Sequence, residues 1–326
     1  MKLKQKLQIV EISRVSPPAV HAAFTDLMEN PFDKSSSSLL CCYRQATDHV
    51  SRDGAIVILT LRKETLEVIN KVLIKELGTD LRDPKLMYDG QRAIVTAFAK
   101  TIDENEQAHT KMLSVFSTTG QSWSSKHWFG DDGWWIWKPQ WINNKAFGFA
   151  YHRPADYISL YEGDPTRAMR VHKPNVFGLA KNNKGFPNES ALLFDHDGEA
   201  TVFLRRDADT FSAQFGTSTP PYTKWFWHDL GIYIGGPCAI ALTKTTFLVA
   251  GRHVNWETRE FSTRLWHFDK TNKTLTEILT MPSSGDTSYP GLILDNDLLY
   301  MSYYSSHIDN QARVYVAKID GVKSLF

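Results

Sequence analysis

The sequence predicts an all-β fold, a six-bladed β-propeller, from three observations. Hairpin-like units rich in β-branched and aromatic residues recur along the 326-residue chain, as is typical of strands. Their turns are centred near residues 31, 89, 144, 197, 244 and 296, so the repeat is about 50 residues long, as in one propeller blade. Both ends of the chain, Leu7–Ser13 and Val314–Ile319, also resemble strands. We expect these two strands to pair in the last blade and to close a ring.

Each expected blade begins with a hairpin of two strands joined by a short turn. The six hairpins are Ala22–Asn30 with Leu39–Arg44, Pro84–Tyr88 with Arg92–Lys100, Pro139–Ile142 with Lys145–Arg153, Glu189–Phe194 with Glu199–Arg206, Pro237–Leu242 with Thr246–Arg252, and Leu292–Leu294 with Leu298–Tyr304. Segments between the hairpins supply outer strands, such as Ile56–Leu61 and Thr263–Asp269. The spacing of Leu66–Leu77 also fits a helix, but its Val and Ile content favours a strand. The sequence therefore predicts one propeller domain over residues 1–326, with two unrelated β-sandwiches as the alternative.

Composition excludes several classes of partner. The formal net charge is +1, which gives no electrostatic reason to bind nucleic acid or an anionic membrane. No stretch approaches the roughly 18 apolar residues of a membrane span. The three cysteines, Cys41, Cys42 and Cys238, do not suggest a disulfide framework, and the histidines lack a metal-binding spacing such as His-x-x-x-His. We expect a cytoplasmic protein with no cofactor and no metal.

Charged residues recur at two positions of the repeat. In a propeller, the start of the innermost strand and the end of the second strand of every blade lie on one rim. The strand starts carry Asp26, Asp83, Glu189 and Tyr289, and the second-strand ends carry Arg44, Arg153, Arg205 or Arg206, and Arg252. Tyr304 and His307 follow the last hairpin. Carboxylates, arginines and a tyrosine in one mouth suit glycoside transfer, which needs a proton donor, a nucleophile and groups that hold the sugar.

The spacing of these residues resembles that of the sialidase superfamily, whose BNR-type propellers have six blades. Glu189 is followed sixteen residues later by Arg205, Leu248–Arg252 resembles the segment that carries the family's next arginine, and Tyr289 falls where the nucleophile falls. The resemblance implies that Tyr289 and Glu189 form the nucleophilic pair and that Arg205 and Arg252 bind substrate. It also implies that Asp48, in the loop Tyr43–His49, is the general acid, with Asp83 as the other candidate.

Longer blocks resemble a bacterial subgroup of sialidase-like proteins whose substrate is undefined. The blocks are Phe24–Leu27, Asp80–Leu86, Pro220–Trp225, Gly235–Pro237 and Gly285–Leu292. The structural Asp-box turn of the family survives only as Ser117–Trp123, in which Thr119 replaces the aspartate. A late supporting acid is expected near Asp309.

One departure affects the expected substrate. Where the family places its first arginine, this chain has Phe24-Thr25-Asp26, and a carboxylate there would repel a substrate carboxylate. Either Arg44, Arg82 or Arg153 replaces that arginine, or the substrate is not a standard sialic acid. Asp26 could instead bind sugar hydroxyls or act as the acid.

These residues predict an exo-acting glycoside hydrolase of the sialidase-like type whose partner is a glycan or small sugar. The expected substrate-binding residues are Asp26, Arg44, Arg82, Arg205, Arg252, Tyr304 and His307. One alternative is a five-bladed furanosidase-like hydrolase that uses Arg82-Asp83-Pro84, which the number of blades would distinguish. The other is a carbohydrate-binding propeller without catalysis.

Overall fold

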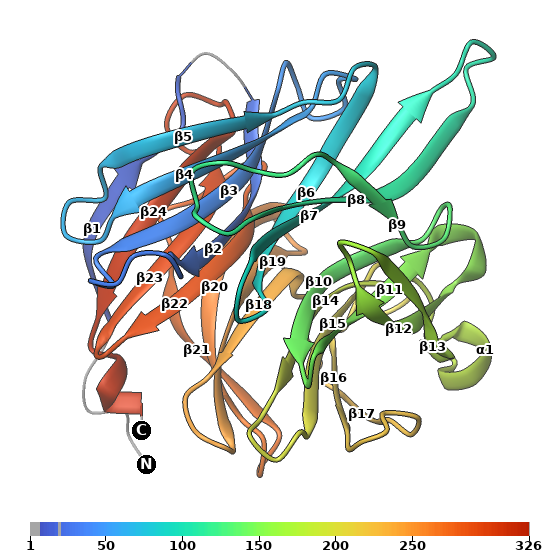
Figure 1. Ribbon diagram of the computed structural model, residues 1–326. Coiled ribbons are helices and arrows are strands. Elements are labelled where there is room, and N and C mark those ends of the chain that lie inside the picture. The colour runs from blue at the N-terminus through green and yellow to red at the C-terminus, as the bar shows by residue number, and fades with distance from the viewer. Residues whose placement is uncertain (1–6, 19–20, 326) are drawn as a thin grey trace.

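Six four-stranded antiparallel sheets are arranged around a central axis in the computed structural model, which describes residues 7–18 and 21–325 (Figure 1). The predicted six-bladed β-propeller is therefore confirmed, and both the five-bladed alternative and the pair of β-sandwiches are wrong. In each of the first five blades the chain runs from the innermost strand outward, because successive strands pair through short turns. Such local pairing is what the hairpin pattern of the sequence encodes.

The first three blades contain residues 21–178. Blade one consists of β2 (His21–Glu29), β3 (Ser38–Ala46), β4 (Ala55–Arg62) and β5 (Val68–Ile74). Blade two consists of β6 (Thr79–Tyr88), β7 (Ala93–Ile102), β8 (Ala108–Ser117) and β9 (His127–Phe129). Blade three consists of β10 (Trp135–Ile142), β11 (Lys145–His152), β12 (Tyr157–Asp164) and β13 (Ala168–Gly178). The strand favoured after Leu66 is present as β5, so the helix alternative was wrong.

The other three blades follow the short helix α1 (Leu179–Asn182). Blade four consists of β14 (Pro187–Phe194), β15 (Ala200–Arg206), β16 (Gln214–Ser218) and β17 (Phe226–Asp229). Blade five consists of β18 (Gly235–Ala241), β19 (Thr246–Asn255), β20 (Glu260–Asp269) and β21 (Thr274–Thr280). Blade six consists of β22 (Ser288–Asp295), β23 (Leu298–Ser305), β24 (Arg313–Asp320) and, from the other end of the chain, β1 (Gln8–Arg14).

The ring is closed by the pairing of β1 with β24. The two strands are antiparallel, with register from Gln8 opposite Asp320 to Arg14 opposite Tyr315, and blue β1 lies beside the red strands of the last blade in Figure 1. Ile9 and Ile12 pack against the apolar cluster of that blade. The expected closure by the N-terminal strand is confirmed.

The core lies between adjacent blades, where the inner strands are buried on both faces. The innermost strands of blades one and six approach very closely, since a Cβ added to Gly291 would lie 2.2 Å from the backbone nitrogen of Leu27. On the axis, Asp26 accepts a hydrogen bond of 2.7 Å from the ammonium of Lys138. Lys138 Nζ also lies 3.5 Å from Cys238 Sγ, so side chains from blades one, three and five meet inside the ring.

The innermost strands share an irregularity near their start. The strand register shifts between Ala23 and Asp26, Arg82 and Lys85, Trp137 and Gln140, Pro187 and Ser190, Gly235 and Cys238, and Ser288 and Gly291. Inside these bulges φ is positive at Phe24, Asp83, Lys138, Gly236 and Tyr289. A bulge turns a side chain away from the regular alternation of a strand. The repeated bulge therefore changes the direction of a side chain near the start of each innermost strand.

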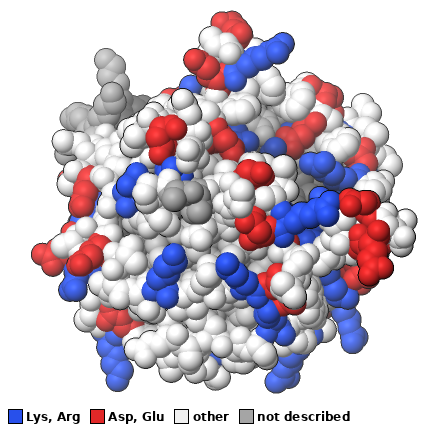
Figure 2. Space-filling view, turned by 90° about the horizontal axis from the view of Figure 1, so that it is seen from above, with Lys and Arg blue, Asp and Glu red and all other residues white. Residues whose placement is uncertain are grey.

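Acidic and basic side chains alternate over the face seen in Figure 2. This interspersion agrees with the near-neutral net charge of +1. Among the described residues, the helices are too short and too polar to cross a membrane.

Candidate active site

A cavity of about 750 Å³ opens at the end of the axis where the bulges lie. That volume is in the range of small-molecule sites. Each blade contributes to its wall; in blade order, one residue from each is Phe24, Asp83, Tyr151, Glu189, Arg252 and Tyr289. Residues that are far apart in the sequence thus face a single space.

Tyr289, Glu189 and Arg205 form a compact hydrogen-bonded group in the wall of the cavity. The hydroxyl of Tyr289 donates to Glu189 Oε1 at 2.6 Å. Arg205 Nη1 donates to Glu189 Oε2 at 2.7 Å and to the Tyr289 hydroxyl oxygen at 3.0 Å. The backbone N–H of Gly236 also donates to Glu189 Oε2, at 2.9 Å. The three predicted residues are therefore in direct contact.

The environment of Tyr289 keeps its phenol neutral. Burial raises the pKa of Tyr289 well above its usual value, and the Glu189 carboxylate raises it further, while Arg205 and Arg252 act in the opposite direction. The phenolic proton is already directed at Glu189. This arrangement suits transfer of the proton to Glu189 as the tyrosine oxygen forms a bond.

Asp83 is the second carboxyl group with an unusual environment. It is 5% exposed, and its Oδ1 is buried without a hydrogen-bond partner among the described residues. Burial raises the pKa of Asp83 to about 6, although Arg82 and Lys85 lower it. A carboxyl with such a pKa can hold a proton near neutral pH and donate it.

Four arginines line the cavity, namely Arg82, Arg153, Arg205 and Arg252. The Cζ of Arg252 lies 5.5 Å from the centre of the Tyr289 ring, and the Cζ of Arg82 lies 5.2 Å from the centre of the Phe24 ring. Arg82 therefore lies over the ring of Phe24. Arg82 donates to Asp80, and Arg205 donates to Glu189, so positive and negative charges are largely matched.

Arg44 and Asp26 do not line the cavity, contrary to the expectation that they bind substrate there. Arg44 is fully buried; its Nε donates to Asp80 at 2.7 Å, and its other nitrogens donate to the carbonyls of Asp48 and Ser51. Asp26 is 1% exposed and accepts from Lys138 and from the backbone N–H of Leu86. Both side chains are occupied by interior contacts, because buried charges need partners.

Asp48 and His307 also lie outside the cavity lining. The carboxylate of Asp48 turns back on its own loop and accepts the N–H of Val50 at 2.8 Å, and the neighbouring His49 lines the cavity instead. His307 Nδ1 lies 3.0 Å from Ser305 Oγ, and its ring contacts Tyr315. Asp309 pairs with Arg313 and does not line the cavity either.

Tyr304 does not itself line the cavity but contacts Arg252, which does. Its side chain is fully buried, and its hydroxyl donates to Asp286 Oδ1 at 2.7 Å and accepts from Arg252 Nη2 at 2.9 Å. Arg252 Nη2 also donates to Asp286 Oδ1 at 3.0 Å. Tyr304 thus fixes the orientation of Arg252. Arg153, expected as one possible replacement for the first arginine, lines the cavity from the start of a short 3₁₀ turn.

An aromatic wall and a histidine group lie at the site in addition to the predicted catalytic and substrate-binding residues. Trp135 lies between Phe98, at 3.9 Å between ring centres, and Tyr151, at 5.5 Å, and all three line the cavity. Two histidines, His21 and His49, approach Asp286. The Trp-rich run Trp134-Trp135-Ile136-Trp137 was the available sequence signal for the wall, whereas no motif spacing links histidines to an aspartate more than 200 residues away.

The fold and the cavity define a six-bladed β-propeller of the kind found in sialidases. No protein-family model and no curated protein matches the sequence, whereas solved structures match its fold. A protein of unknown function from Dyadobacter fermentans superimposes with a TM-score of 0.81 at 15% identity, covering 97% of this chain and 99% of that one.

Two enzymes have the same fold at low identity. Trypanosoma rangeli sialidase has a TM-score of 0.68 at 12% identity over 91% of this chain, which spans only 55% of that enzyme. An α-L-arabinofuranosidase from Fusarium graminearum has a TM-score of 0.66 at 10% identity, covering 96% of this chain and 98% of the enzyme. At these identities the likeness establishes the propeller fold and not the chemistry.

Proposed function

We propose that this protein is an exo-acting glycoside hydrolase of the sialidase-like kind. The observation that carries the proposal is the contact of Tyr289 with Glu189 and Arg205 in one wall of a cavity that also contains Asp83. The exo-acting mode is proposed from the resemblance of these residues to those of the sialidase superfamily. The solved sialidase and arabinofuranosidase with this fold support the class of reaction.

The proposed reaction has two half-reactions. In the first, the Tyr289 oxygen bonds to the anomeric carbon and its proton passes to Glu189. The bond from that carbon to the leaving oxygen breaks, and the leaving oxygen takes its electron pair and a proton from Asp83. In the second, water donates a proton to Asp83 and bonds to the carbon, while Glu189 returns the proton to the departing Tyr289 oxygen. Asp83 is favoured over Asp48 as the acid because only Asp83 lines the cavity.

The guanidinium groups bear on the class of sugar. Arg82, Arg205 and Arg252 lie around the reacting tyrosine and can offer paired N–H donors to a carboxylate or to adjacent hydroxyls. We propose that Arg82 takes the part of the arginine that Phe24 replaces. The aromatic wall at Trp135 offers a flat surface for a sugar ring.

The test is a screen of aryl glycosides of 2-keto acid sugars and of neutral pentoses and hexoses. We expect hydrolysis of at least one class, and we expect Tyr289→Phe to lower kcat on it by roughly three orders of magnitude or more. Tyr88→Phe, at an exposed tyrosine whose hydroxyl donates to Gly90, is the matched control. Near wild-type turnover by Tyr289→Phe would show that Tyr289 is not the nucleophile. Glycan binding without release of sugar would instead favour a carbohydrate-binding propeller.

A further inference from the structure

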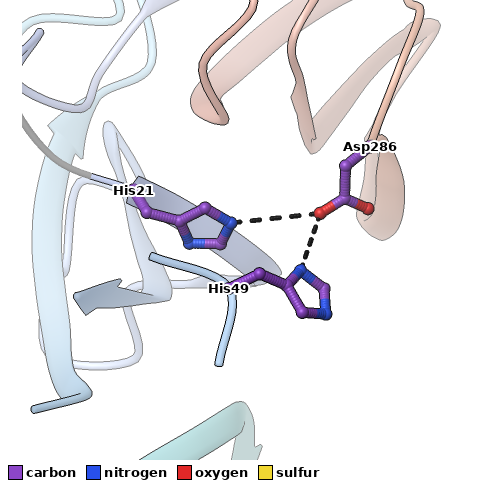
Figure 3. A group of neighbouring side chains, drawn as sticks. All are labelled: His21, His49 and Asp286. Carbon is purple, nitrogen blue, oxygen red and sulfur yellow. Dashed lines mark hydrogen bonds and ion pairs between the residues drawn. The ribbon is translucent and has the colours of Figure 1, made fainter. Parts of the chain in front are cut away.

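Two histidines and one aspartate point toward one another, as Figure 3 shows, and one of them, His49, lines the cavity. His49 Nδ1 lies 2.9 Å from Asp286 Oδ2, and His21 Nε2 lies 3.9 Å from the same oxygen. One ligand atom from each residue falls within 4.8 Å of the others. His21 begins β2, His49 lies in the loop between β3 and β4, and Asp286 precedes β22. Blades one and six thus bring the group together.

A hydrogen bond accounts for His49 but not for His21. The separation of 3.9 Å between His21 Nε2 and Asp286 Oδ2 is too long for a hydrogen bond. The other ring nitrogen of His21, Nδ1, is buried and has no partner in the part of the chain that the structure describes. The His21 side chain is only 13% exposed, so water has little access to supply the missing hydrogen bonds. A largely buried imidazole in this state lacks the partner that buried polar groups ordinarily have.

The aspartate is held so that one oxygen faces the two imidazoles. Asp286 Oδ1 accepts hydrogen bonds from Tyr304 and from Arg252. These donors engage one oxygen and leave Oδ2 directed at His21 and His49 (Figure 3). The carboxylate is therefore fixed in orientation, as a metal ligand should be.

We propose that His21 Nε2, His49 Nδ1 and Asp286 Oδ2 bind a divalent cation of the zinc type. Zinc bonds of about 2.0–2.2 Å in a tetrahedral site place ligand atoms roughly 3.3–3.5 Å apart. The observed separations of 2.9 and 3.9 Å lie on either side of that value, and all three ligand atoms lie within 4.8 Å of one another, so the side chains would close around the ion by small movements. Two imidazoles and one carboxylate are a ligand set that zinc accepts.

Three protein ligands leave a coordination position open. His49 lines the cavity, so the open position would face a bound molecule or water. The cation would also add positive charge beside Phe24, whose ring centre is 5.3 Å from that of His49. Contact between the cation and a sugar rests on the proposed function, whereas binding of the cation does not.

The experiment is a calorimetric titration of the chelator-treated full-length protein with Zn²⁺, repeated by absorption with Co²⁺. We expect one ion per chain, with affinity at least about 100-fold weaker in His21→Ala and in His49→Ala, and a d–d spectrum that these variants lose. His152→Ala removes another cavity histidine outside the group and should leave the affinity unchanged.

Two results would overturn the site. One is the absence of saturable binding at millimolar Zn²⁺. The other is binding that both His21→Ala and His49→Ala retain at wild-type affinity. Thermal unfolding of each variant without metal shows whether a lost signal reflects lost folding. The experiment measures binding of the ion itself. The absence of binding would therefore leave the hydrolase proposal unaffected, and the absence of hydrolysis of every glycoside would leave the metal-binding result unaffected.

Discussion

Asp83 is the residue whose burial most clearly indicates a function, because its charged form destabilises the folded protein. Its carboxyl is buried in the cavity wall with one oxygen unpartnered among the described residues, and its φ of 47° lies in the left-handed region. Burial raises its pKa from 3.8 to about 6. Such a group destabilises the folded chain when it is charged. Costs of this kind are typical of active sites, where they are retained for chemistry.

The first prediction concerns Asp83→Asn. Between about pH 4 and pH 6 the folded protein holds a proton that the unfolded chain has lost, so the free energy of unfolding falls as the pH rises through this window. A shift of about two pKa units corresponds to about 2–3 kcal/mol. We therefore expect Asp83→Asn to stabilise the protein by up to about that amount at pH 7–8 and by much less at pH 4, while hydrolysis of glycosides with poor leaving groups falls. Urea unfolding at the two pH values measures the difference.

A matched substitution, Asp132→Asn, tests whether the effect belongs to burial. Asp132 is 82% exposed, so its substitution should change stability by no more than about 0.5 kcal/mol at either pH. If Asp83→Asn changed the free energy of unfolding equally at pH 4 and pH 8, the titration of the Asp83 carboxyl would not be the cause of the change.

Among the secondary-structure elements, the innermost strands shape the site by repeating one bulge. The bulge gives Phe24, Asp83 and Tyr289 positive φ values of 62°, 47° and 50°, and each side chain lines the cavity. Blade five places Gly236 at this point, with φ of 56°. A glycine is required there, since an added Cβ would lie 2.9 Å from the Tyr289 ring.

The second prediction is that Gly236→Ala impairs the site more than the fold. The added methyl group should displace the Tyr289 ring and weaken the hydrogen bond from the Gly236 N–H to Glu189, so we expect at least a tenfold loss of kcat/KM. Gly90→Ala is the control, because Gly90 also has positive φ, at 95°, but its added Cβ meets nothing within 4 Å. Both variants should lose about 1–2 kcal/mol of stability from backbone strain. Equal activity losses in the two would refute the steric explanation.

For the whole molecule, closure of the ring determines whether the cavity exists. Six blades contribute to its wall, and the ring is fastened by β1, which pairs with β24 at the other end of the chain. Without β1, the edge of β24 would be unpaired and the apolar residues beneath it exposed.

The third prediction is that deletion of residues 1–14 disrupts cooperative folding. We expect the deletion variant to unfold at least about 10 °C below the full chain or to aggregate, because it loses a whole edge strand and its packing. Val10→Ser, on the exposed side of β1, should shift the midpoint by no more than about 2 °C. Calorimetry of the purified variants provides the comparison, and a deletion variant as stable as the full chain would show that β1 is not the closure.

Much of the fold could be predicted from sequence because its signals are local. Turn residues between β-branched strands mark each hairpin, and their recurrence indicates blades. The same repeat brought Glu189, Arg205, Arg252 and Tyr289 to one end of the ring, where the structure has them in or around the cavity. Residues at equivalent positions of a repeat face the same rim whatever their separation in sequence.

The three-dimensional structure alone decided which rim residues enter the cavity. Asp26 and Arg44 occupy the expected positions but pair with Lys138 and Asp80 in the interior, and Asp48 turns away while His49 turns inward. The direction of a side chain depends on bulges, loop conformations and charge partners contributed by other blades. These contacts are long-range, so no single stretch of sequence contains them, whereas the hairpins that build the blades are specified within each repeat.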